Sequence, residues 1–193
     1  SLTATPFMRD GEEANMRLMA SSGPIAIKVG NKELIDQGIL AKPYFKYVDV
    51  PPPVELHPRD AWPAAYRIGI VEHLERNKHI IREANRAVKM GLPTMILIQR
   101  EAHGKSLHKL LQQLNIGKSE FIYGKSKKEE REAALKRLAS GSTNIIIGST
   151  ILDVGVDVPA VGLIVLAGGG KAEVAIRQRI GRGLRKKKTG PNV

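Results

Sequence analysis

The sequence contains no cysteine among its 193 residues. Disulfides and thiolate metal sites are therefore excluded, and the absence of cysteine is typical of a reducing compartment, so we expect a cytoplasmic protein. No apolar run approaches the roughly 18 residues of a membrane helix, so we expect no membrane-spanning segment. Aromatic residues make up only 4% of the chain, which argues against a broad stacking platform for nucleic-acid bases.

Complete motifs for holding a nucleotide or a metal ion are also absent. The glycine-lysine pairs that begin at Gly104, Gly124 and Gly170 each lack the glycine five residues earlier that a phosphate-binding loop requires. Each pair is either a turn with a solvated lysine or a turn whose backbone N–H groups and lysine hold a nucleic-acid phosphate. There is no HExxH motif and the five histidines are scattered, so we expect no metal site in this chain.

Positive charge is concentrated in one part of the chain. Residues 1–60 hold 7 Lys and Arg against 8 Asp and Glu, whereas residues 61–193 hold 24 against 11. Such a basic region points to a polyanion partner, most often nucleic acid, although a membrane surface or plain solubility would also account for it.

Short apolar segments alternate with helical patterns from residue 64 onward. The expected strands are residues 93–99, 119–124, 143–150 and 161–168, and the expected helices are residues 64–91, 104–116, 126–141 and 171–185. Strands that read as continuous apolar runs are typical of a parallel sheet with both faces covered by helices. The sequence therefore predicts an α/β fold with a mostly parallel sheet between two helical layers.

Two breaks precede this region. Ser21–Pro24 (SSGP) ends a helical stretch, and residues 25–29 (IAIKV) are predicted to form a short strand. Val48–Pro58 (VDVPPPVELHP) is expected to be an extended linker, because consecutive prolines fit neither a helix interior nor a central strand.

Ligands of parallel α/β sheets bind at the carboxyl ends of the strands. The segments at those ends here, residues 99–106, 123–126, 149–157 and 167–171, are all rich in glycine or polar residues. We therefore expect the functional site at this edge of the sheet. A carboxylate at Asp157 would accept hydrogen bonds from a sugar hydroxyl or pair with an arginine.

The helix expected at residues 171–185 presents arginines on one face. Gln178, Arg182 and Arg185 are spaced i, i+4, i+7, nearly opposite a stripe of isoleucine and leucine. Two guanidinium groups one turn apart fit a polyphosphate that is losing its terminal phosphoryl group. A solvated cationic face, or arginines on a nucleic-acid backbone, would have the same spacing. Residues 185–188 (RKKK) continue as a generic basic tail.

Four segments resemble motifs of superfamily 2 helicases and translocases, and they occur in the family's order. Leu2–Pro6 (LTATP) looks like motif III, Met95–Arg100 (MILIQR) like motif IV, Ser149–Pro159 (STILDVGVDVP) like motif V, and Gln178–Arg185 (QRIGRGLR) like motif VI. Motif VI reads GRGLR rather than GRAGR, which favours the branch of phage fork-remodelling helicases, restriction-enzyme translocase subunits and repair helicases. The resemblance implies a RecA-like three-layer α/β/α motor domain.

In that family two RecA-like motors hold ATP and Mg²⁺ between them, and the second motor supplies arginine fingers. By resemblance, Arg182 and Arg185 are the catalytic fingers, Gln178 orders their network, and Gly155 and Asp157 approach the nucleotide. The phosphate loop and the acidic metal box belong to the first motor, and both are missing here. We therefore expect the 193-residue chain alone to lack ATPase activity.

The same resemblance implies contacts with DNA and coupling between the two sites. The residues expected on the nucleic-acid backbone are Arg100, His103, Lys105, Gly124, Lys125 and Thr150. Thr3 and Thr5 would couple the nucleotide state to strand binding. The implied partners are single-stranded or branched DNA and the missing N-terminal motor.

Three regions follow from this resemblance. Residues 1–24 would be the tail of the first motor, residues 25–59 an inter-motor segment and linker, and residues 60–193 the second motor. Two alternatives stay open, a nucleic-acid-binding module of the same fold without catalysis and the translocase subunit of a restriction enzyme.

Overall fold

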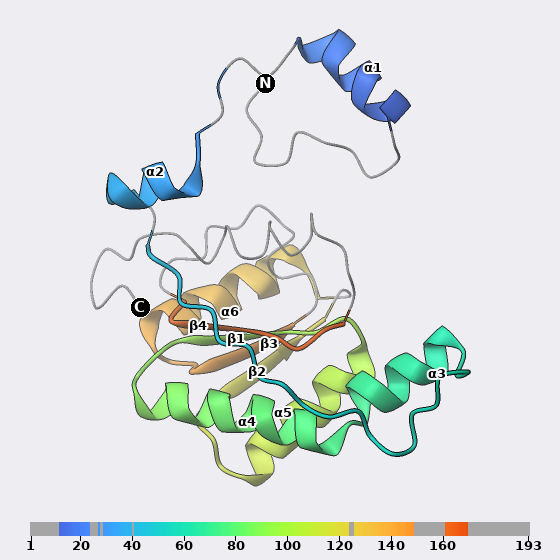
Figure 1. Cartoon of the computed structure of the whole chain (residues 1–193). Helices are drawn as coiled ribbons and strands as arrows, with labels where there is room; N and C mark the ends of the chain where they lie inside the picture. Colours follow the sequence, from blue (N-terminus) through green and yellow to red (C-terminus); the bar gives the residue numbers. More distant parts are fainter. Residues whose placement is uncertain are drawn as a thin grey trace.

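The structure is a computed structural model that describes residues 12–23, 27, 29–39, 41–123, 126–148 and 161–169 (Figure 1). The helices are α1 (Glu12–Ser22), α2 (Asn31–Asp36), α3 (Trp62–Tyr66), the π-helical turn η1 (Arg67–Val71), α4 (Leu74–Lys89), α5 (Glu101–Gln113) and α6 (Lys128–Ser140). The strands are β1 (Thr94–Leu97), β2 (Ser119–Ile122), β3 (Ile145–Gly148) and β4 (Leu163–Leu166). None of the described helices is both long enough and apolar enough to cross a membrane.

The four strands form one parallel sheet in the order β2-β3-β1-β4. The register pairs Thr94 with Ile145 on one side of β1 and with Leu163 on the other. Every residue of the central strands β1 and β3 is buried, which explains why they read as continuous apolar runs rather than alternating ones. The four strands predicted from residue 93 onward and the parallel sheet are confirmed.

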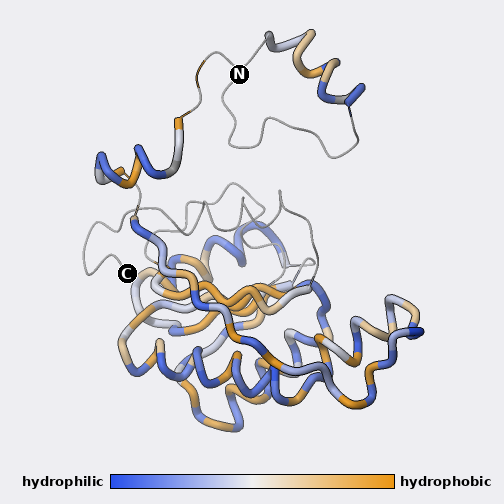
Figure 2. The backbone as a smooth tube through the Cα atoms, viewed as in Figure 1, coloured by the Kyte–Doolittle hydropathy of each residue, from blue (hydrophilic) through white to orange (hydrophobic). Residues whose placement is uncertain are grey.

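Helices cover both faces of the sheet, α4 and α5 on one face and α6 on the other (Figure 1). Side chains alternate along β1, so Ile96, and Ile98 just after the strand, pack with α4 and α5, whereas Met95 and Leu97 pack with α6. Figure 2 shows the resulting apolar band along the strands, with hydrophilic residues on the outer sides of the helices. The layered α/β architecture is therefore as predicted.

The helix predicted at residues 64–91 is interrupted at residues 72–73, between η1 and α4. His73 is extended (φ −65°, ψ 102°), and its Nδ1 accepts from the Arg76 backbone N–H at 3.3 Å, which caps α4. The Asn77 side chain donates to the Val71 carbonyl at 2.8 Å, which satisfies the end of η1. The continuous-helix prediction was wrong because these two side chains satisfy backbone groups at the break.

The linker Val48–Pro58 forms no helix or strand, but it is not extended throughout as predicted, because Leu56 N–H donates to the Pro53 carbonyl and Asp60 N–H to the His57 carbonyl in two turns. Two contacts join this part of the chain to α4 and its N-cap residue. Lys46 pairs with Glu83 at 2.6 Å, and His73 Nε2 donates to the Pro51 carbonyl at 2.9 Å. The strand predicted at residues 25–29 is not found among its described residues, since Ile27 and Val29 lie outside any strand.

Candidate functional site

The carboxyl ends of the parallel strands meet at one edge of the sheet. β1 leads into Gln99 and Arg100, and β4 leads into Ala167, Gly168 and Gly169. β1 and β4 are adjacent, so these two segments lie side by side at the edge where ligands of parallel sheets bind.

Tyr66, at the end of α3, joins the two segments. Its hydroxyl donates to Gln99 Oε1 at 3.0 Å and accepts from the Gly169 backbone N–H at 3.1 Å. Its ring lies 5.6 Å from the Arg100 guanidinium carbon, a cation–π contact. Trp62 packs edge-on against the ring, with 5.8 Å between centroids. Tyr66 is only 4% exposed, so its ring is held from several sides.

The turn after β4 is anchored mainly by backbone groups. The N–H groups of Ala167 and Gly168 both donate to the Leu97 carbonyl at 2.9 Å. A Cβ on Gly168 would lie 3.0 Å from Gln99 Cγ, and one on Gly169 would lie 3.1 Å from Tyr66 Cε2. The two glycines therefore let this turn approach β1 and α3 more closely than other residues would.

Sequence reasoning gave no role to Tyr66. The residue lies 103 positions before Gly169, and its spacing fits an ordinary buried position of an amphipathic helix. No local signal in the sequence links these two residues.

Arg100 and Lys105 lie at the exposed start of α5. Arg100 is the extended N-cap residue (φ −117°, ψ 132°). Lys105 is exposed and pairs with Glu101 at 2.7 Å. An exposed pair of this kind contributes little to stability, so Lys105 can exchange Glu101 for another anion at small cost.

His103 was predicted to contact nucleic acid, and the structure corrects that expectation. Its side chain is fully buried between α5 and α4, and Nε2 lies 2.9 Å from Asn77 Oδ1. Burial, followed by the positive charge of Arg76, lowers the pKa of His103 to about 4. A buried, neutral imidazole at neutral pH does not bind a phosphate backbone.

The predicted loop at residues 99–106 is mostly helical. α5 begins at Glu101, so Gly104, Lys105 and Ser106 lie within its first two turns and do not form a turn around a phosphate. A Cβ on Gly104 would lie 2.2 Å from Phe121 Cε2 and 2.5 Å from Ile98 Cδ1. Gly104 therefore serves the packing of α5 on the sheet.

Gly104→Ala is expected to destabilise the domain by about 1–3 kcal/mol. Alanine is the better helix former by about 1 kcal/mol, but the added methyl group overpacks the interface with Phe121 and Ile98. Urea unfolding measures the change, with Gly141→Ala as a second variant, because Gly141 has open space around its Cβ and strain only from its φ of 78°. An unchanged or higher stability of Gly104→Ala would contradict the packing role.

The remaining predicted site residues lie outside the described residues and stay predictions. They are Thr3, Thr5, Gly124, Lys125, Thr150, Gly155, Asp157, Gln178, Arg182 and Arg185. Among the residues that the structure does describe, no group of three or more His, Asp or Glu is placed to hold a metal ion.

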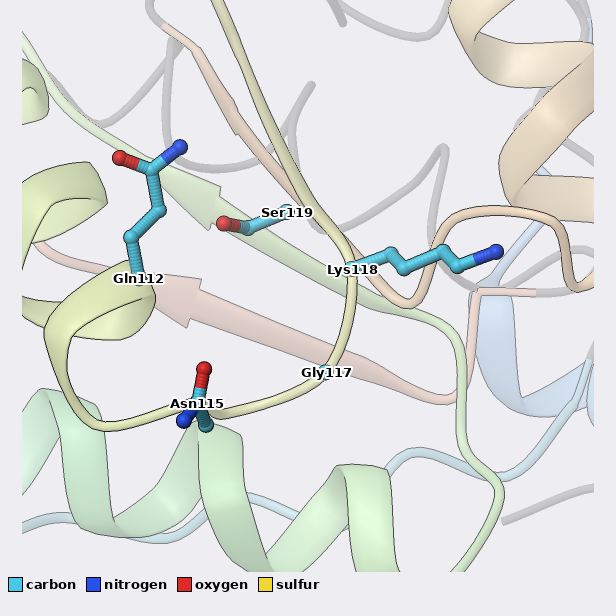
Figure 3. Close-up of a pocket in the computed structure, with 5 residues that line it drawn as sticks. All are labelled: Gln112, Asn115, Gly117, Lys118 and Ser119. Carbon is cyan, nitrogen blue, oxygen red and sulfur yellow. The ribbon is translucent and has the colours of Figure 1, made fainter.

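A polar hollow lies at the opposite edge of the sheet (Figure 3). It is lined by Gln112, Asn115, Gly117, Lys118 and Ser119. Gln112 lies in the last turn of α5, Ser119 begins β2, and the other three residues lie between these elements, so the hollow lies at the amino ends of the strands. It is separate from the edge formed by Arg100 and Gly169.

Residues 74–187 match the family of the helicase conserved C-terminal domain. The match covers more than half of the chain, and the chain belongs to this family. It is the C-terminal domain of a superfamily 2 helicase, as the resemblance of its motifs implied.

Two relatives show how far the similarity extends along the chain. "Putative helicase 22" of Sulfolobus islandicus filamentous virus (isolate Iceland/Hveragerdi) is 27% identical over 195 residues, which cover 95% of this chain and 34% of the relative. "DNA 3'-5' translocase XPB2" of Sulfurisphaera tokodaii is 43% identical over 63 residues, 33% of this chain and 14% of that protein. The chain thus spans about a third of the viral relative.

A solved structure, "The crystal structure of T4 UvsW", aligns with a TM-score of 0.56 and 24% identity. The alignment covers 65% of this chain and 25% of that one. Together with the parallel sheet, this match confirms the RecA-like α/β fold.

Proposed function

We propose that the chain is the second motor domain of an ATP-dependent DNA helicase or translocase. The observation that carries the proposal is the family match over residues 74–187, a range that includes the three residues Gln178, Arg182 and Arg185. The relatives named as DNA helicases and translocases favour DNA over RNA as the polymer.

On the ATP side, Arg182 and Arg185 act as fingers on the γ-phosphoryl group, and Gln178 orders them. Charge on the three equatorial oxygens of that group grows in the transition state, and a guanidinium fork placed there stabilises it. Gly155 and Asp157 approach the nucleotide. The other motor would supply the phosphate loop and the acidic residues that bind Mg²⁺, which form the first half of the site.

On the DNA side, Arg100 and Lys105 contact the phosphate backbone at the exposed start of α5. The support is their exposure, their position at the carboxyl edge of the sheet and the excess of positive charge in residues 61–193. Gly124, Lys125 and Thr150 complete this contact, and Thr3 and Thr5 couple it to ATP.

The test is Arg100→Ala in the full-length enzyme, with DNA affinity measured at several salt concentrations. Loss of one phosphate contact is expected to weaken binding to all sequences alike and to reduce the slope of log affinity against log salt by about 1. ATP turnover with and without DNA is measured in the same samples.

Arg86→Ala is the matched control. Arg86 is exposed near the end of α4, at the amino edge of the sheet and away from the proposed DNA contact. An Arg100→Ala slope equal to that of the wild type would contradict the DNA contact. DNA binding without any ATP turnover would instead favour the binding module without catalysis.

A further inference from the structure

Tyr66 contacts Arg100, which the proposed function assigns to DNA, and the turn that precedes the arginine-bearing segment assigned to ATP. Its ring faces Arg100, which is assigned to DNA, at 5.6 Å. Its hydroxyl holds the N–H of Gly169 at 3.1 Å, and Gln178 follows Gly169 by only nine positions in the sequence. The Tyr66 side chain thus contacts Arg100 through its ring, at 5.6 Å, and Gly169 through its hydroxyl, at 3.1 Å.

Of the hydrogen bonds that hold the turn at residues 167–169, the one to the Tyr66 hydroxyl depends on a side chain. Leu97 holds Ala167 and Gly168 through its backbone carbonyl, which any residue would supply. The Gly169 N–H donates to a side-chain hydroxyl, and that hydroxyl in turn donates to Gln99. Removing the hydroxyl leaves a donor on Gly169 and an acceptor on Gln99 without these partners.

The place of Tyr66 in the chain also favours a role in coupling. α3 begins at Trp62, soon after the proline-rich linker that is tied to α4 through Pro51. Trp62 packs on the Tyr66 ring, and the ring is almost fully buried. The Tyr66 ring therefore has little free space in which to move independently of its neighbours.

We propose that Tyr66 is a positioning residue that couples DNA contact at Arg100 to the Gly168–Gly169 turn, and through that turn to the arginines of the ATP site. The proposal rests on the proposed function. When Arg100 engages a phosphate, its contact with the ring changes, and the hydroxyl on the same ring carries the change to Gly169.

The experiment is Tyr66→Phe in the full-length enzyme, which keeps the ring and removes only the hydroxyl. DNA-stimulated kcat is expected to fall about tenfold relative to DNA-free turnover, the range of a typical coupling between sites. The KM for ATP and the Kd for DNA are expected to stay within about twofold, because neither ligand touches the hydroxyl. Tyr47→Phe, the same change at a residue that is 91% exposed, is expected to behave as the wild type.

Gln99→Met provides a second variant that alters the same contact from an exposed position. It removes the acceptor of the Tyr66 hydroxyl and is expected to lower the stimulation in the same direction. The double variant with Tyr66→Phe is expected to be no worse than Tyr66→Phe alone, because both changes break one connection. Additive losses, or wild-type stimulation in Tyr66→Phe, would overturn the coupling role.

The outcome also separates this inference from the proposed function. If Arg185→Ala abolishes turnover while Tyr66→Phe keeps full stimulation, the coupling role fails and the arginine fingers stand. If Arg185→Ala leaves turnover unchanged, the proposed function itself fails.

Discussion

Arg185→Ala in the full-length enzyme is expected to lower ATP turnover by about 1,000-fold or more while nucleotide binding stays largely intact. The guanidinium fork is proposed to act on charge that develops only in the transition state, so its loss lowers kcat more than it weakens ground-state binding. Turnover is measured at saturating DNA and ATP, and nucleotide affinity is measured separately with a labelled nucleotide.

Two further variants define the role of this arginine. Arg185→Lys keeps the charge but not the planar fork, so most of the loss is expected to remain. Lys187→Ala removes one positive charge two positions further along, in the basic tail, and is expected to have little effect on turnover. Equal losses in Lys187→Ala and Arg185→Ala would point to general charge rather than a finger, and unchanged turnover in Arg185→Ala would remove it from the site.

Lowering the pH from 7.5 to 5 is expected to lower the free energy of unfolding by about 2 kcal/mol through His103 alone. Burial, and then the charge of Arg76, lowers the pKa of His103 from 6.5 to about 4. The unfolded chain therefore binds a proton below pH 6.5 that the folded protein does not. The contribution of His103 to stability is fully present above pH 6.5 and is lost as the pH falls toward 4. Below pH 4 this residue causes no further loss.

Urea unfolding at pH 7.5, 6.5, 5.5 and 5 measures this dependence. His103→Gln removes the titrating ring, so the slope of unfolding free energy against pH is expected to become much shallower, whatever the variant's stability at pH 7.5. His57→Gln, at an exposed position of the linker, is expected to keep the wild-type slope. Equal slopes in wild type and His103→Gln would contradict the assignment.

The pH range separates His103 from a second hydrogen-bonded group, the partly exposed pair of Glu120 and Arg137. The hydrogen bond from Arg137, and also the one from Thr143, lowers the pKa of Glu120 below its ordinary 4.5. The stability that Glu120 contributes is present above pH 4.5 and is lost below it. Measurements at pH 5 and above therefore report on His103 with little contribution from Glu120.

The order of the motifs and the pattern of apolar residues predicted the fold and the family without a structure. The runs at residues 95–98 (MILI) and 145–147 (III) are apolar throughout because strands buried on both faces need no polar side. The alternation of such runs with helical patterns gave the parallel α/β fold, and the four ordered motifs gave the family.

Several local assignments failed because they depended on particular side-chain contacts that the sequence pattern does not show. The break between η1 and α4 is stabilised by His73 and Asn77, and neither residue is a strong helix terminator in a sequence. Gly104 looks like part of a phosphate turn until Phe121 and Ile98 are seen against it. His103 looks like an exposed loop residue until α4 is packed over it.

The sequence by itself determined the class of fold and the helicase family, because these depend on periodicity and on short motifs whose residues are near one another in the chain. Only the tertiary structure decided which groups at the sheet edge touch. Tyr66 meets Gly169 across 103 positions, and His103 is neutral because α4 covers it. Contacts of this kind arise from the packing of separate elements, which local spacing does not encode.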